Sequence, residues 1–228
     1  FDFSLIRRAA EHRDCELAFG RSDLHEYAFE NAELLVNFGA DFIETWGNTV
    51  QNARRFADMH AYNEGKKNRC IHVGPHQSLS GARADEWLLA NPGTEAMIAL
   101  AMAHAIHQRD PRHDFLSDYL SPYSPELVAG ETGISAEKIQ ALAEEFHQAS
   151  SLAVAGGTWN SSEQATATQV AVFILNAAAG NLGKTLRFHE SEQPSEDTSH
   201  SQILQLLSDL NAGKVKLLIV DDSNPLHT

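Results

Sequence analysis

The chain has 228 residues, 43% of them hydrophobic and 21% charged, an ordinary globular composition that suffices for one large or two small domains. Its formal net charge of −14 argues against binding to nucleic acid or to an anionic membrane, because contact with phosphate requires clustered Lys and Arg side chains. A solvated acidic surface is the simpler interpretation of this charge, and docking to a basic partner such as a cytochrome is the more specific one.

The sequence contains no apolar run long enough for a transmembrane helix, so no direct membrane span is expected. It begins at Phe1 rather than at a methionine, without a signal segment, and ends at Thr228 just past an expected strand. We therefore interpret it as a piece of a longer protein.

The two cysteines, Cys15 and Cys70, form no C-x-x-C pair and predict neither an iron–sulfur nor a zinc site. Cys70 is expected to be a buried structural thiol.

Apolar periodicity predicts helices and strands that alternate along the chain. In order, these are a helix at 4–11, a strand at 34–38, a helix at 49–62, a strand at 70–73, helices at 95–108 and 136–148, a strand at 152–155, helices at 166–179 and 203–210, and a strand at 215–220. Residues 110–125 form a turn-rich connector, and residues 189–201 form a polar surface excursion. The helix at 95–108 is apolar nearly all round and should be deeply packed, and Ser135 is placed to cap the helix that follows it.

This alternation favours an α/β fold with a doubly wound, mainly parallel sheet in three α/β/α layers, similar to nucleotide-binding domains. The strands at 34–38 and 70–73, with the helix between them, form a β-α-β unit whose strands are parallel. The whole chain, 1–228, is then a single α/β domain or a fragment of a larger subunit, with a first half at 31–110 and a second half at 126–228.

Ligands of open α/β sheets bind beyond the carboxyl ends of the strands. Four such ends carry small or polar residues, at 39–41, 74–76, 156–158 and 221–224. Together they indicate a nucleotide-like site, although strand ends need turn residues in any case. The segment 84–95 points the same way, because its Pro-Gly-Thr turn leads into a buried helix whose first backbone N–H groups would face a ligand.

Several familiar sites are missing from the sequence. No G-x-G-x-x-G follows the first strand and no G-x-x-x-x-G-K-[ST] occurs, so neither an ordinary NAD site nor a P-loop is expected. The motifs G-x-S-x-G and H-E-x-x-H are absent as well. His104 and His107 share one helix at a spacing that can hold a metal, but without a third ligand the favoured interpretation is surface or packed histidines.

One stretch has a closer parallel in a known family. Ala84-Asp85-Glu86-Trp87-Leu88, followed by Pro92-Gly93-Thr94-Glu95, resembles the A-D-E-W-L and P-G-T-D motifs of molybdopterin oxidoreductases. Stretches at 39–45, 133–139, 176–183 and 215–225 are similar to further motifs of that family in the same order, so the resemblance covers most of the chain. A more detailed likeness at 38–46, 53–57 and 73–80 is to one branch, the molybdopterin-enzyme-like large subunit of alternative complex III and related menaquinol reductases.

In that branch the fold is kept without a molybdenum cofactor. The resemblance therefore implies a subunit that supports electron transfer in a quinol-oxidising, membrane-associated respiratory complex. It implies no catalytic residue, metal or cofactor in this segment, and it places iron–sulfur clusters and haems in partners, namely an iron–sulfur domain and cytochrome subunits. The location that it implies is the periplasmic side, peripheral to the inner membrane.

The alternative is a catalytic molybdoenzyme domain that binds bis-molybdopterin guanine dinucleotide with Mo or W. The residues that would line its pterin-guanine site are Gly39, Asp41, Glu44, Gly93, Thr94, Glu95 and Asn224. Molybdenum enzymes place an aspartate where Gly74 stands and an arginine where His76 stands. Because glycine accepts no side-chain hydrogen bond and histidine pairs poorly with phosphate near neutral pH, we expect an eroded cofactor site. A stand-alone nucleotide-binding protein is a third interpretation, which the missing phosphate loop disfavours.

Overall fold

The computed structural model describes residues 15, 17–20, 24–63, 65–156, 164–189 and 200–219. The chain divides into two compact units, a larger one of residues 25–189 and a smaller one of residues 1–24 and 190–228. Within the described residues no helix has both the length and the hydropathy needed to cross a membrane. Strands from both expected halves of the chain, before residue 110 and after residue 126, lie in one sheet of the larger unit.

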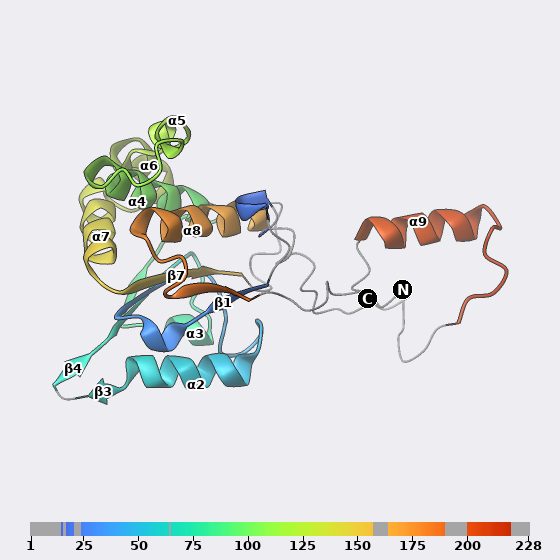
Figure 1. The fold of residues 1–228 in the computed structure, drawn as a ribbon, viewed down its shortest axis with the longest axis horizontal. Coiled ribbons are helices and arrows are strands. Elements are labelled where there is room, and N and C mark those ends of the chain that lie inside the picture. The colour runs from blue at the N-terminus through green and yellow to red at the C-terminus, as the bar shows by residue number, and fades with distance from the viewer. Residues whose placement is uncertain are drawn as a thin grey trace. The chain divides into compact units, whose positions relative to one another are not determined.

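The centre of the larger unit is a sheet of four parallel strands, shown in Figure 1. Their order across the sheet is β6 (Glu86–Leu88), β5 (Arg69–Val73), β2 (Leu34–Phe38) and β7 (Ser151–Ala155). In the register of the sheet, Leu35 lies beside Cys70 on one side and Leu152 on the other. The winding therefore reverses between β2 and β7, the arrangement of a doubly wound nucleotide-binding fold. The predicted fold class is confirmed.

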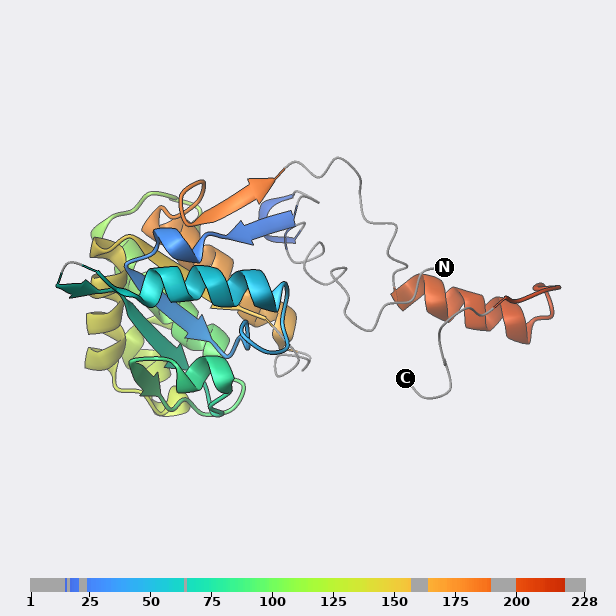
Figure 2. The same ribbon diagram turned by 90° about the horizontal axis from the view of Figure 1, so that it is seen from below.

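Helices cover both faces of this sheet and complete three layers. One face carries α2 (Thr49–His60) and α3 (Leu79–Ala82), seen from below in Figure 2. The other carries α4 (Glu95–Arg109), α7 (Ala136–Gln148) and α8 (Ala165–Ala179), with α5 (Leu116–Leu120), η2 (Ser121–Tyr123) and α6 (Pro125–Thr132) outside α4. Because both faces are covered, the central strands are mostly apolar, and β2 and β7 are completely buried.

The helices confirm the local signals of the sequence. In α4 every residue from Ile98 to Ala103 is buried, as its all-round apolar composition predicted. Helix α7 has the bounds that were predicted, its N-cap Ser135 accepts a hydrogen bond from the Lys138 backbone, and its apolar face is buried. Cys70 is fully buried, and burial raises the pKa of its thiol to about 12, as expected of a structural cysteine.

Two segments differ from the prediction because their patterns are short. The fourth strand of the sheet is β6, in a stretch where no strand was predicted, and three residues are too few to display a period. The connector at 110–125 contains α5 and η2, and α6 follows it with Ser124 as N-cap and Gly133 as left-handed C-cap.

Smaller strands lie outside the main sheet. Strands β1 (Leu24–Tyr27) and β8 (Leu186–His189) form a pair, and η1 (Phe29–Asn31) leads from β1 toward β2. Strands β3 (Tyr62–Asn63) and β4 (Lys66–Lys67) form an antiparallel pair after α2. The basic residues Lys66 and Lys67 therefore lie in a hairpin.

The outer edge of β7 is closed by side chains. Asn176 of α8 accepts a hydrogen bond from the Ala153 backbone N–H (3.1 Å) and donates to the Ala153 carbonyl (2.9 Å). The Thr185 hydroxyl donates to the Ser151 carbonyl (2.6 Å). These bonds satisfy backbone groups that a further strand would otherwise pair with.

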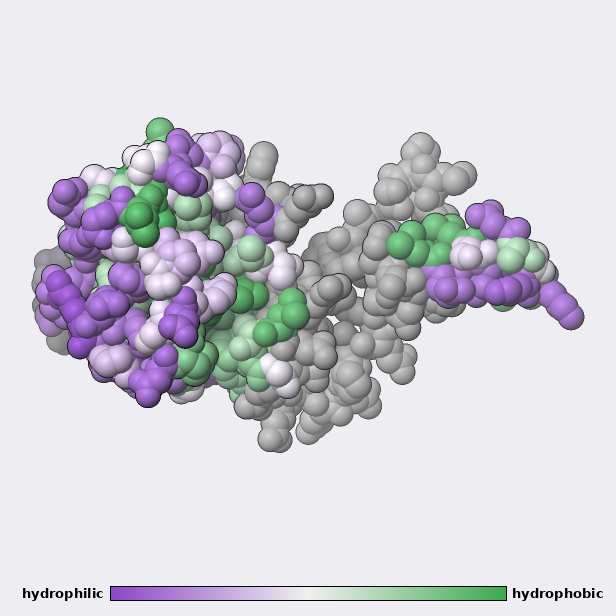
Figure 3. All heavy atoms as spheres, turned by 90° about the horizontal axis from the view of Figure 1, so that it is seen from above, coloured by the Kyte–Doolittle hydropathy of each residue, from purple (hydrophilic) through white to green (hydrophobic). Residues whose placement is uncertain are grey.

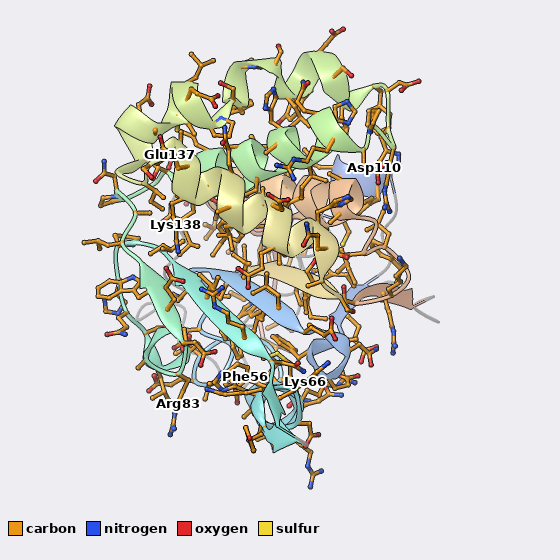
Figure 4. The ribbon with its side chains drawn as sticks, turned by 90° about the vertical axis from the view of Figure 1, so that its left-hand side faces the viewer. Phe56, Lys66, Arg83, Asp110, Glu137 and Lys138 are labelled. Carbon is orange, nitrogen blue, oxygen red and sulfur yellow. The ribbon has the colours of Figure 1, made fainter. Side chains whose placement is uncertain are left out.

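At the opposite side of the sheet an ion-pair network joins β5, β6 and α7. Arg69 bonds both Glu145, at 2.6 Å, and Glu86. Lys138, labelled in Figure 4 in the first turn of α7, reaches Glu86 at 2.5 Å. Because all four side chains are partly exposed, we assign the network a modest role in stability.

Of the smaller unit the structure describes α9 (His200–Asn211), which confirms the helix predicted at 203–210. The strand predicted at 215–220 is wrong for the residues described, because 215–219 form no strand and Leu217 and Ile219 are 76% and 80% exposed. An apolar run becomes a strand only with a neighbour to accept its backbone hydrogen bonds. The helix expected at 4–11 and most of the excursion at 189–201 lie outside the described residues.

Candidate functional site

The place where the winding of the sheet reverses is where open α/β sheets bind ligands. Three glycines follow the strands there, Gly39 after β2, Gly74 after β5 and Gly156 after β7, with φ of 75°, 153° and 140°. We call these residues and their neighbours the strand-end site. Each φ lies in the region that only glycine adopts without strain, so the chain turns sharply at all three ends. The fourth expected end, at 221–224 with Asn224, lies outside the described residues.

Asp41 is buried, 2% exposed, and its carboxylate bonds to the chain itself. One oxygen accepts hydrogen bonds from the Ser80 hydroxyl (2.9 Å) and the Ser80 backbone N–H (3.3 Å), and the other accepts from the Thr45 hydroxyl (3.3 Å). The Ser80 hydroxyl also accepts from the Ile43 N–H (3.0 Å). Asp41 therefore links the turn after β2 to α3, and its carboxylate has a structural role.

Glu95 has a different environment. It is the first residue of α4 and is 7% exposed, and a carboxylate there is stabilised by the helix dipole. Its Oε1 atom lies 3.9 Å from where a Cβ on Gly74 would be, and the Gly39 Cα lies at the same distance from that point. No residue in the described part of the chain hydrogen-bonds to the Glu95 side chain. Two of the predicted site residues, Gly39 and Glu95, are thus brought together around Gly74.

The turn before α4 holds two more of the predicted residues. Gly93 has a φ of 79°, and a Cβ there would lie 2.5 Å from Oε1 of Gln164, so that side chain covers the turn. Thr94 occupies the N-cap position of α4, but its hydroxyl donates to the Asn91 carbonyl (2.7 Å) and caps nothing. Glu44, also predicted, is exposed on the turn after β2.

A series of buried, hydrogen-bonded polar groups joins the ends of β2 and β5. The sequence analysis did not predict it. The Asn37 side chain exchanges hydrogen bonds with the Ala40 backbone, both at 2.8 Å, and approaches His72 Nδ1 at 3.2 Å. His72 Nε2 lies 2.7 Å from the His76 carbonyl, so Nε2 carries the proton and Nδ1 accepts from Asn37. Burial lowers the pKa of His72 below its ordinary value, outweighing the bond to His76 that raises it. The imidazole is thus neutral at pH 7 and orders the site.

Trp46 lies on the third strand end. A Cβ on Gly156 would lie 2.5 to 2.7 Å from three atoms of the Trp46 indole, so the ring rests directly on the Gly156 backbone. The Tyr27 ring packs on the indole with a centroid distance of 5.6 Å. The side chain of the turn after β2 therefore covers the end of β7.

A separate cavity of about 510 Å³ lies on the outer helices, away from the strand ends, between α4, α6 and α7. Its walls include His104 and His147, whose Nδ1 atoms are buried without a hydrogen-bond partner among the described residues. Burial lowers the pKa of His104. His107, which shares its helix, bonds the Ser117 hydroxyl at 2.8 Å, and the described residues contain no group of three side chains that could hold a metal ion.

No protein-family model matches the chain. In sequence it is similar to the menaquinone reductase molybdopterin-binding-like subunit of Nitratidesulfovibrio vulgaris, 28% identical over 69% of this chain and 24% of that protein. It is also similar to the arsenate respiratory reductase molybdopterin-containing subunit of a Shewanella species, 23% identical over 72% of this chain and 23% of that protein. In structure it matches acetylene hydratase from Pelobacter acetylenicus with a TM-score of 0.61 and 19% identity, over 79% of this chain and 25% of that one.

The relatives named as molybdopterin subunits support a place for this chain in the molybdopterin oxidoreductase superfamily. The resemblance read from its motifs is thereby confirmed, and so is the α/β fold. The chain spans about a quarter of the length of the relatives it matches.

The strand-end site disagrees in three respects with the pterin dinucleotide of this superfamily as the resemblance placed it. The turns at 39–48, 74–82 and 89–95 contain no Lys or Arg but carry carboxylates, which repel a pyrophosphate. The Asp41 carboxylate is already bonded to Ser80 and Thr45. Gly74 has a φ of 153°, where an aspartate would be strained. Of the predicted acidic side chains, Glu95 alone is buried and left to accept a hydrogen bond from a ligand.

Proposed function

We propose that this molybdopterin oxidoreductase-like domain is a structural part of a respiratory complex that exchanges electrons with quinone, and that it holds no cofactor of its own. The observation that carries the proposal is the use of the Asp41 carboxylate inside the chain, by Ser80 and Thr45, at the position where a ligand would need it. One relative, the molybdopterin-binding-like subunit of a menaquinone reductase, supports the same function.

The partners in this proposal are other subunits of the complex: an iron–sulfur domain and cytochrome subunits, whose clusters and haems carry the electrons. The net charge of −14 suits docking to a basic partner. Viewed from the side of α5 and α6, hydrophilic residues cover most of the larger unit, with scattered hydrophobic ones between them (Figure 3). We further propose that the complex is peripheral to the inner membrane on the periplasmic side.

The direction of electron flow between quinone and the complex can be tested separately. The resemblance to alternative complex III implies quinol oxidation, whereas the similar protein is named for menaquinone reduction. An assay of the purified complex in both directions, with menaquinol as donor and with menaquinone as acceptor, decides between them.

A second candidate function is a catalytic domain that binds molybdopterin guanine dinucleotide with Mo or W. The observation in its favour is Glu95, a buried carboxylate beside Gly39 and Gly74. No described residue hydrogen-bonds to its side chain, so it can accept hydrogen bonds from the N–H groups of a guanine or pterin ring. A relative named as a molybdopterin-containing arsenate reductase subunit also favours it.

The test is the metal and pterin content of the full-length parent protein, measured by elemental analysis and by the fluorescence of the oxidised pterin. We expect neither molybdenum nor tungsten in stoichiometric amount in a folded, active complex. Stoichiometric metal with pterin would overturn the proposal and establish the second candidate. In that case Glu95→Gln should lower the pterin content, while Glu137→Gln, at an exposed position in the first turn of α7, serves as the matched control.

A further inference from the structure

The indole of Trp46 is held on the strand-end site by contacts on several sides. It rests on the backbone of Gly156, where any Cβ would collide with it, and Tyr27 packs on it at 5.6 Å with a 53° tilt. Tyr27 is itself fixed, because its hydroxyl accepts a hydrogen bond from Gln169 of α8 at 2.7 Å. The indole is therefore held between Tyr27 of β1 and the Gly156 backbone at the end of β7.

The backbone of Trp46 is fixed as well. Its N–H donates to the Asp41 carbonyl (3.1 Å), and its own carbonyl accepts from the Asn52 side chain of α2 (3.3 Å). The Asp41 carboxylate is in turn bonded to Ser80 of α3. The turn that carries the indole is thus anchored at both ends to helices of the same face.

We propose that Trp46 is an internal plug: its indole occupies the place, at the reversal between β2 and β7, that a planar heteroaromatic ring would occupy in an open site of this fold. Gly156 permits this because it has no Cβ. The inference deepens the proposed function and rests on it, since it gives the physical reason why the domain holds no pterin. The bicyclic indole and a bicyclic pterin have similar size and shape, so removing the first leaves room for the second.

The test uses neopterin, a fluorescent pterin, titrated against the full chain with fluorescence anisotropy as the readout. We expect Trp46→Ala to bind neopterin about tenfold more tightly than the unaltered chain, because an aromatic ring gains buried contact area in the vacated place. Phe115→Ala is the matched control, since it removes an aromatic ring that is 77% exposed and away from the strand ends. Far-UV circular dichroism establishes that each variant is folded, and Trp46→Leu replaces Trp46→Ala if the alanine variant is not.

Each outcome bears on the plug. Tighter binding by the Trp46 variant alone supports it. A folded Trp46 variant that binds neopterin no better than Phe115→Ala overturns it, and so does an unaltered chain that binds as tightly as the variant. The pterin content of the parent protein separates this result from the proposed function: if the protein holds no pterin and the variant gains no binding, only the plug is wrong.

Discussion

Replacing Asn176 with alanine should destabilise the larger unit more than any exposed polar substitution. The side chain is fully buried, and its amide uses both its donors and its acceptor. It accepts from the Ala153 N–H and the Asn181 amide (3.2 Å), and it donates to the carbonyls of Ala153 and Val172 (3.0 Å). Alanine would leave the Ala153 N–H and C=O without partners at a buried sheet edge.

The magnitude follows from those two groups. A buried backbone donor or acceptor left unpaired costs about 1–3 kcal/mol, so the loss of both predicts about 2–6 kcal/mol. That is a large part of the roughly 5–15 kcal/mol that stabilises a typical domain. With a urea m-value near 2 kcal/mol/M, the unfolding midpoint of Asn176→Ala should fall by about 1 M or more.

The assay is urea unfolding followed by tryptophan fluorescence and far-UV circular dichroism. Gln148→Ala is the matched control, because that side chain also makes an amide hydrogen bond, to Glu144 at 3.2 Å, but is exposed. Its midpoint should change by no more than the equivalent of about 0.5 kcal/mol. If Asn176→Ala unfolded at the same urea concentration as Gln148→Ala, the reasoning that side chains close the β7 edge would be refuted.

Three further predictions concern the strand-end site and the surface. Asp41→Ala should cost about 1.5–3 kcal/mol, measured by thermal unfolding, because it removes charge-assisted hydrogen bonds, and it should leave the pterin content of the parent protein unchanged. Gly74→Ala should cost about 1–3 kcal/mol because its φ of 153° strains any side chain, whereas Gly130→Ala, in an open helical position, should be neutral or slightly stabilising in the same melt. Burial alone would raise the pKa of Asp85, but hydrogen bonds, led by that from Lys67, lower it to about 2. The stabilisation from this carboxylate is therefore complete above its ordinary pKa of 3.8 and is lost as the pH falls toward 2; Asp85→Asn should flatten that part of the stability profile, and an unchanged profile would contradict the assignment.

The sequence predicts those parts of the fold whose causes are local. Helix α7 could be delimited because its cap Ser135 and its apolar face lie within one stretch of chain. Strands β2 and β7 could be found because burial on both faces makes them mostly apolar. The strand expected at 215–220 has the same composition, and it failed because pairing depends on a neighbour that composition does not specify.

The candidate site was predictable in position but not in chemistry. The turns after β2 and β5 could be located from Gly39 and Gly74, since parallel strands end at one edge of a sheet. What Asp41 does there depends on Ser80, 39 residues away, and no periodic pattern reports such a bond. The contact of the Trp46 indole with the Gly156 backbone is equally non-local.

Those long-range contacts share one consequence. A ligand site at strand ends keeps polar groups and space for its ligand. When the ligand departs, those polar groups lose their partners, and a buried polar group without a partner is costly. Here the polar groups find partners within the chain instead: Asp41 in Ser80, and His72 in Asn37 and the His76 carbonyl. Space is filled in the same way, by Trp46. Such a site is stable when empty, as the proposed structural role requires. Glu95 is the exception among the predicted acidic residues, because it is buried and no described residue hydrogen-bonds to its side chain, as the cofactor-binding alternative would require.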